Sequence, residues 1–173
     1  MRVFSYPIKD EYPPYLGTYI DLVKDEKDIL QLMQRQAKEI IGLIEGVSDV
    51  FMDEAYAEGK WTISELIIHL IDSERIFCTR ALCFARGEKQ SLPGYEQDDY
   101  VLQSRAAERS KESILEEYIA NRIATLAFFK GLSKKTHDIQ GQANGLIVSV
   151  RALLYTIAGH EKHHLGVLKD RYL

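Results

Sequence analysis

Three of the five histidines lie in one short stretch, GHEKHHLGVL, as His160, His163 and His164. Two histidines four residues apart on an α-helix are separated by about 400° of rotation, so both imidazoles lie on one face. That spacing allows two rings to bind the same metal ion. The chemistry that this stretch suggests is therefore metal binding by His160 and His164.

The apolar pattern of the same segment separates the inward rings from the outward one. At about 100° per residue, Ile157 lies at the centre of an apolar stripe about 80° wide on either side. The other members of the stripe are Val150, Leu153, Leu154, Leu165 and Leu168. His164 falls near its centre and His160 at its edge, whereas His163 falls about 120° away and is expected at the surface. Glu161 also falls inside the stripe, where a carboxylate needs a partner; it is a candidate general base or a group that orients a ligand.

A third inward histidine, His69, lies in the segment WTISELIIHLIDSER. Its ring is about 60° from Leu66, the centre of the apolar stripe there, and so faces the interior. Three histidines with one open position suit Zn²⁺, and imidazole also suits Ni²⁺, Fe²⁺ or Cu²⁺. Glu65 and Asp72 could orient His69 through a hydrogen bond. His137 lies in an irregular segment and has no comparable argument.

Helical spacing and punctuation residues predict the elements that carry these side chains. Four long helices are expected, over residues 21–45, 62–86, 110–130 and 149–173. The second has the clearest start, because Thr62 and Glu65 are spaced as a capping box. We therefore predict an all-α fold, a four-helix bundle formed by a single domain over residues 1–173.

The segments between the helices are expected to be irregular. Prolines at positions 7, 13 and 14 predict an extended N-terminal arm over residues 1–20. A polar loop is expected at 87–103. The segment 131–148 is also expected to be irregular, with a small hairpin or turn near Asn144 and Gly145.

Composition excludes several classes of protein. The 173 residues include 22 Lys and Arg against 26 Asp and Glu, a net charge of −4, and no clustered basic face, which argues against a nucleic-acid partner. The sequence has no signal peptide or long apolar run, so we expect no membrane association and a cytoplasmic location. Cys78 and Cys83 are expected to be small buried side chains without a disulfide.

Three stretches together resemble the DinB-like (DinB/YfiT) superfamily, from about residue 21 to the C-terminus. They are GKWTISELIIHLIDSERIFCTRAL, LPGYEQDDY and VSVRALLYTIAGHEKHHLGVLKDRYL. The family signature is one histidine early in the second helix and an H-x-x-x-H on the last, here His69, His160 and His164. The resemblance implies a four-helix bundle that holds a divalent metal near one end and often forms a homodimer. It implies metal-dependent hydrolysis, S-transfer with a low-molecular-weight thiol, or thiol-dependent isomerisation.

The sequence leaves several functions open. Activation of water would give a hydrolase, and activation of a low-molecular-weight thiol would give an S-transferase; both use the same three ligands. Zn²⁺ and Ni²⁺ are the expected ions, and the expected substrate is a small molecule. Arg75 and Arg80 could reach an anionic substrate or thiol. A metal- or ligand-binding bundle without catalysis is the alternative.

Overall fold

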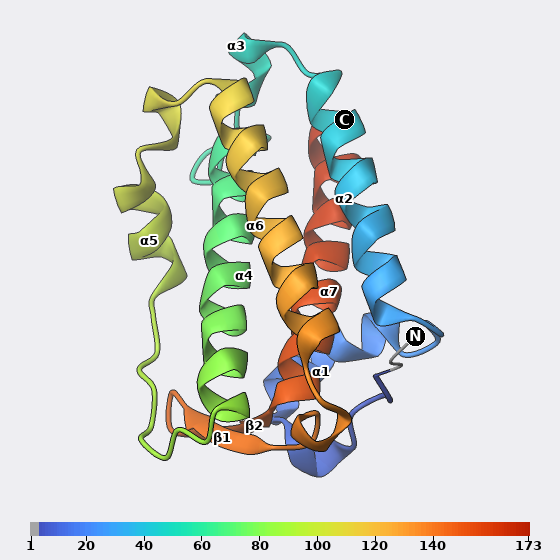
Figure 1. The fold of residues 1–173 in the computed structure, drawn as a ribbon. Coiled ribbons are helices and arrows are strands. Elements are labelled where there is room, and N and C mark those ends of the chain that lie inside the picture. The colour runs from blue at the N-terminus through green and yellow to red at the C-terminus, as the bar shows by residue number, and fades with distance from the viewer. Residues whose placement is uncertain (1–3) are drawn as a thin grey trace.

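The fold, described here by a computed structural model over residues 4–173, is built on four long helices that lie side by side (Figure 1). Their bounds are α2 Ile29–Glu45, α4 Ile63–Ala85, α6 Lys111–Gly131 and α7 Val150–Val167. A π-helical turn over Leu168–Tyr172 continues α7. The predicted all-α four-helix bundle is confirmed. None of the helices within residues 4–173 combines the length and apolar character needed to cross a membrane.

Side-chain caps determine where these helices begin. Asp28 accepts hydrogen bonds from the backbone amides of Leu30 and Gln31, and so α2 begins at Ile29 rather than near residue 21. Thr62 Oγ1 accepts a hydrogen bond from the Glu65 amide at 3.2 Å, and Glu65 Oε2 accepts one from the Thr62 amide at 2.8 Å. This capping box fixes the start of α4 as predicted. Ser110 caps α6 and Ser149 caps α7, each through a hydroxyl that accepts a hydrogen bond from the backbone amide three residues later.

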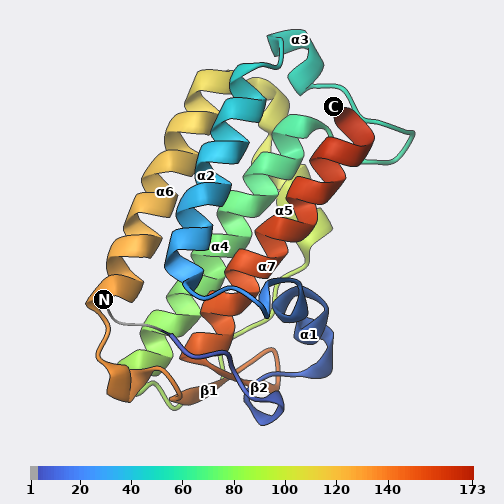
Figure 2. The ribbon, with the colours of Figure 1, turned by 90° about the vertical axis from the view of Figure 1, so that its right-hand side faces the viewer.

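Two expectations for the connecting segments were wrong. The N-terminal arm is not extended throughout, because Pro14–Ile20 form the helix α1, which packs on α7 (Figure 2). Pro14 starts this helix without cost, since the first helical position needs no amide hydrogen. The polar loop also contains a helix, α5 (Gln97–Ser104), which lies beside α4. The remaining short elements are α3 Asp49–Met52 and 3₁₀ turns at Lys9–Glu11, Asp21–Val23, Ala106–Glu108 and Lys134–Thr136.

The irregular segment before α7 contains the expected hairpin. Strands β1 (Gln140–Ala143) and β2 (Leu146–Ser149) pair antiparallel. Asn144 and Gly145 join them with φ angles of 50° and 74°, the left-handed conformations that a two-residue type I′ turn requires. The hairpin also holds the chain before α5: the Leu92 amide donates to Gln142 O, and the Asn144 amide donates to Leu92 O, both at 2.9 Å.

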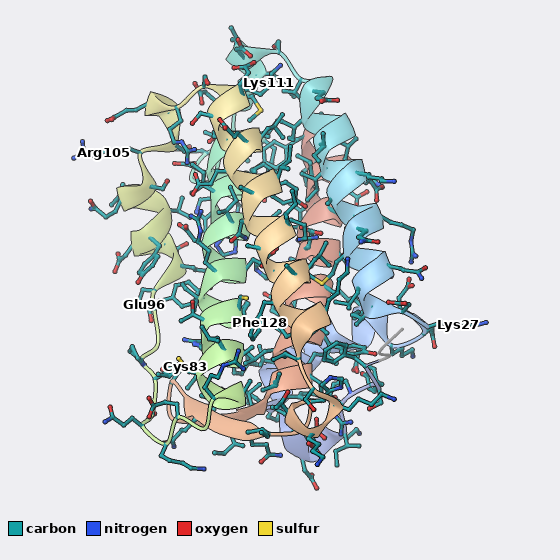
Figure 3. All side chains as sticks on the ribbon, viewed as in Figure 1. Lys27, Cys83, Glu96, Arg105, Lys111 and Phe128 are labelled. Carbon is teal, nitrogen blue, oxygen red and sulfur yellow. The ribbon has the colours of Figure 1, made fainter. Side chains whose placement is uncertain are left out.

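Side chains fill the space between the long helices (Figure 3). The buried apolar side chains form two clusters that follow one another along the helices. One cluster, near the hairpin, includes Phe84 and Phe129; the other, near α3, includes Ile67 and Ile114. Each of the four long helices places buried polar side chains between the clusters, and we group one from each helix. We call this set the polar layer; its members are Gln36, Glu74, Arg122 and Glu161.

Candidate metal centre

The three histidines selected from the sequence come together between α4 and α7. His69 Nε2 lies 3.0 Å from His160 Nε2, and His164 Nε2 lies 3.2 Å from the same atom. One ring nitrogen from each residue can be chosen so that all three lie within 4.8 Å of one another. His69 and His160 are buried and His164 is half-buried. His163 is exposed, as expected.

The surroundings keep these three rings neutral at pH 7. Burial lowers the pKa of His69 to about 4, although the negative charge of Asp98 acts in the opposite direction. Burial, together with the neighbouring His69 and His163 rings, lowers the pKa of His164 to about 3. The pKa of His160 lies well below 6.5, again mainly because of burial. A neutral imidazole is the form that binds a metal ion.

Hydrogen bonding between the rings cannot satisfy the cluster. A neutral imidazole has one N–H donor and one acceptor nitrogen. His160 Nε2 is therefore either a donor or an acceptor, and in either case it can form a full hydrogen bond with only one of its two neighbours, His69 and His164. His164 Nδ1 is also buried, and no atom of the described residues forms a hydrogen bond with it. One cation can accept a lone pair from all three Nε2 atoms at once, so this donor set fits a divalent metal ion.

A serine and several aromatic rings surround the cluster. Ser73 Oγ lies 3.5 Å from His69 Nδ1 and 3.0 Å from the Tyr95 hydroxyl. The ring of Trp61 packs on His69 at 4.6 Å between centroids, and Tyr19 packs edge-on to His160 at 5.1 Å. Ser73 lies one helical turn after His69 on the same face. That position was a signal available in the sequence, although the spacing there suggested carboxylates instead.

The carboxylates expected to orient His69 have other partners. Glu65 is engaged in the capping box with Thr62. Asp72 lies 4.0 Å from the guanidinium of Arg75. In the hydrogen bonds formed by residues 4–173, the polar group next to His69 Nδ1 is the Ser73 hydroxyl.

Glu161 points into the polar layer and not toward the histidine rings. Its carboxylate accepts hydrogen bonds from the Tyr118 hydroxyl at 2.7 Å and from Arg122 Nη1 at 2.8 Å. Arg122 also donates to Glu74, with Nη2 at 2.6 Å from Oε2, and to the backbone oxygen of Met33 at 2.8 Å. Burial raises the pKa of Glu161 and Arg122 lowers it, with a net rise. The structure therefore places this carboxylate where it joins α7 to α6, next in sequence to His160.

A cavity of about 370 Å³ opens beside the cluster. His160 and Phe77 form part of its wall, α1 contributes Tyr15 and Tyr19, and the segment before α5 contributes Tyr95. A cavity of this size accommodates a small molecule. The arrangement thus places one member of the histidine cluster, His160, in the wall of a pocket.

Comparison with known proteins gives the family of this chain and relatives of similar fold. The family model of the DinB superfamily matches residues 32–168. A protein of Oceanobacillus iheyensis, named "Putative metal-dependent hydrolase", is 25% identical over 148 residues, which cover 85% of each chain. The structure of YfiT from Bacillus subtilis, described as "a probable metal-dependent hydrolase with an unusual four-helix bundle topology", superposes with a TM-score of 0.75 at 18% identity, covering 96% of this chain and 94% of YfiT.

Proposed function

Because this chain belongs to the DinB superfamily, we propose that it is a metal-dependent enzyme in which His69, His160 and His164 hold one divalent ion, Zn²⁺ or Ni²⁺. The observation that carries the proposal is the meeting at one point of three neutral imidazoles, two buried and one half-buried, whose nitrogens cannot all be satisfied by hydrogen bonds between the rings. The proposed reaction is hydrolysis of a small molecule. The names of the Oceanobacillus and Bacillus relatives support that choice.

The metal ion, the residues around it and the cavity have separate roles in the proposed reaction. When bound, the ion would act as a Lewis acid and lower the pKa of a water or thiol nucleophile. Ser73 fixes the orientation of His69 through Nδ1, and the cavity beside His160 receives the substrate. Glu161 is a positioning residue and not the general base, because its carboxylate is already bonded to Arg122 and Tyr118.

One observation favours S-transfer as a second candidate. Within residues 4–173, no carboxylate oxygen is hydrogen-bonded to the three rings. Hydrolysis usually relies on a base that accepts a proton from water. A low-molecular-weight thiol needs no such base, because coordination to a soft metal removes its proton outright.

The test begins with metal content. Protein purified without a polyhistidine tag should contain about one divalent ion per chain, and His69→Ala should contain none, as measured by mass spectrometry of the metals. The loaded protein is then assayed on ester and amide substrates with and without a low-molecular-weight thiol. Turnover without thiol supports hydrolysis, and turnover only with thiol supports transfer. A wild-type chain that refuses Zn²⁺, Ni²⁺ and Fe²⁺ on titration would overturn the proposal.

A further inference from the structure

In the part of the chain that the structure describes, residues 4–173, Arg80 is a buried cation without an anionic partner. Its side chain is on α4 and only 8% exposed. Arg122, the other deeply buried arginine, pairs with Glu74 and Glu161, and the half-buried Arg151 pairs with Glu11. Among residues 4–173, no carboxylate oxygen lies within 4.0 Å of the Arg80 guanidinium. A buried charge is costly unless it is paired, so this exception needs an explanation.

The groups around Arg80 hold its guanidinium in place without neutralising it. Nη2 donates a hydrogen bond to the backbone oxygen of Pro93 at 2.8 Å. The guanidinium carbon lies 5.8 Å from the centroid of the Phe77 ring and 5.9 Å from that of Tyr95. These ring contacts stabilise a cation but carry no charge. A guanidinium has five N–H donors, so most of them stay available to a ligand.

The same guanidinium borders the cavity that reaches the histidine cluster. Arg80, Phe77 and His160 all line it, and the Phe77 ring lies 6.2 Å from the His160 ring. One aromatic ring therefore separates the arginine from the proposed metal ligand. A molecule held at Arg80 can place a second group beside His160.

The acidic residues in the cavity wall do not neutralise Arg80. Glu96 and Asp98 also line the cavity, but both residues are exposed, so water solvates their carboxylates. Asp98 acts on the pKa of His69, which places its charge toward the histidine end. Of the charges in this wall, Arg80 is the buried one, and within residues 4–173 it forms no ion pair.

We infer that the cavity binds a small molecule whose carboxylate pairs with Arg80, whose apolar body packs on the aromatic wall, and whose other end reaches the histidine cluster. The planar guanidinium fork matches a carboxylate, with which it forms two parallel hydrogen bonds. The rings of Tyr15, Tyr19 and Phe77 supply the apolar wall. This inference names the substrate class of the proposed enzyme, and it rests on the proposed function for the reaction but not for the binding.

The test compares a carboxylate probe with its neutral counterpart. The full chain is titrated with 3-phenylpropionate and with 3-phenylpropionamide by ligand-observed NMR, both metal-free and loaded with Zn²⁺. The wild type should bind the carboxylate at least about tenfold more tightly than the amide in both forms, the amount expected of a charge-assisted hydrogen bond. Equal affinity for the two probes in the metal-free wild type would overturn the inference, and this arm needs no variant to fold.

Two matched variants locate the interaction on Arg80. Arg80→Gln should lose the preference for the carboxylate, whereas Arg86→Gln should keep it. Arg86 is exposed at the C-cap of the same helix, directly after Ala85, and both changes remove one positive charge. Circular dichroism and metal content check that Arg80→Gln is folded. A folded Arg80→Gln protein that keeps the preference would overturn the inference.

A third variant distinguishes two neighbouring hollows. Arg80 also borders a hollow on the outer side of α4, together with the exposed Thr79. Thr79→Trp would fill that hollow and should leave binding of 3-phenylpropionate unchanged. Loss of binding in this variant would place the ligand outside the cavity and contradict the inference.

The two proposals fail separately. If the wild type binds the carboxylate through Arg80 but refuses Zn²⁺, Ni²⁺ and Fe²⁺ on titration, the proposed function fails and this inference stands. A metal-loaded enzyme without preference for the carboxylate would do the reverse.

Discussion

Gly159 of α7 lies so close to the backbone of Tyr19 that a β-carbon at position 159 would come within 2.1 Å of the Tyr19 carbonyl oxygen. This approach lets α1 lie directly on α7, one residue before His160. It also places the Tyr19 ring against the His160 ring. The N-terminal helix therefore closes the site because one helical position carries no side chain.

The first prediction concerns that contact. Gly159→Ala should lower the free energy of unfolding by about 1–3 kcal/mol, the cost of forcing a group into a packed interface. Gly166→Ala, on the same helix, has no atom within 4 Å of the added carbon and should be neutral or stabilising by about 0.5–1 kcal/mol. Urea unfolding followed by circular dichroism measures both. Equal effects of the two changes would show that α1 does not pack as described.

The second prediction separates two adjacent histidines. His164→Ala should lose the bound metal ion, because its Nε2 belongs to the cluster. His163→Ala should keep about one ion per chain, since His163 is exposed. The metal content of both variants is measured after dialysis against a weak chelator. Retention of the ion by His164→Ala and loss by His163→Ala would contradict the assignment.

The third prediction concerns the buried arginine of the polar layer. Arg122→Met leaves Glu74 and Glu161 without their shared cation and should destabilise the fold by about 3–5 kcal/mol. The comparison is Arg35→Met, which breaks an exposed pair with Glu26 and should cost at most about 1 kcal/mol. Chemical denaturation at pH 7 gives both values. A similar small loss in the two variants would mean that the buried pairing adds little.

The fourth prediction is the pH dependence of the metal-free protein. Folding lowers the pKa of His69 from 6.5 to about 4, so below pH 6.5 the unfolded chain binds more protons than the folded one. Stability must therefore fall as the pH is lowered from 6.5 toward 4, by about 2 kcal/mol per buried histidine between pH 7 and pH 5. Urea unfolding in the presence of chelator measures this slope.

A variant assigns that slope to the cluster. His164 also has a lowered pKa, about 3, so His164→Leu should show a shallower loss of stability between pH 7 and pH 5 than the wild type. An unchanged slope would mean that other groups control acid unfolding.

Local signals in the sequence predicted the parts of the fold that short-range contacts determine. The capping box at Thr62 and Glu65 involves residues three apart, and the inward faces of His69 and His160 follow from helical periodicity alone. Helix α1 was missed because a seven-residue helix is marginal by itself and forms here against α7. Helix α5, with eight residues, was missed for the same reason, because it is similarly short and packs on α4.

The missed features of the site depend on contacts between distant segments. Arg80 is buried because Pro93 and Tyr95, on the segment held by the hairpin, fold back over α4. Glu161 is turned away from the rings because Arg122, 39 residues earlier, binds it. The spacing of residues along one helix cannot predict either contact.

The polar layer also restricts which vertical alignments of the four helices are possible. Apolar side chains alone tolerate sliding, because one aliphatic contact replaces another at little cost. A slide of α6 by one turn, about 5.4 Å, would move the Arg122 guanidinium away from Glu74 and Glu161 and into one of the apolar clusters. The polar layer thus selects a single position of each helix along the bundle axis. The same alignment brings His69 level with His160.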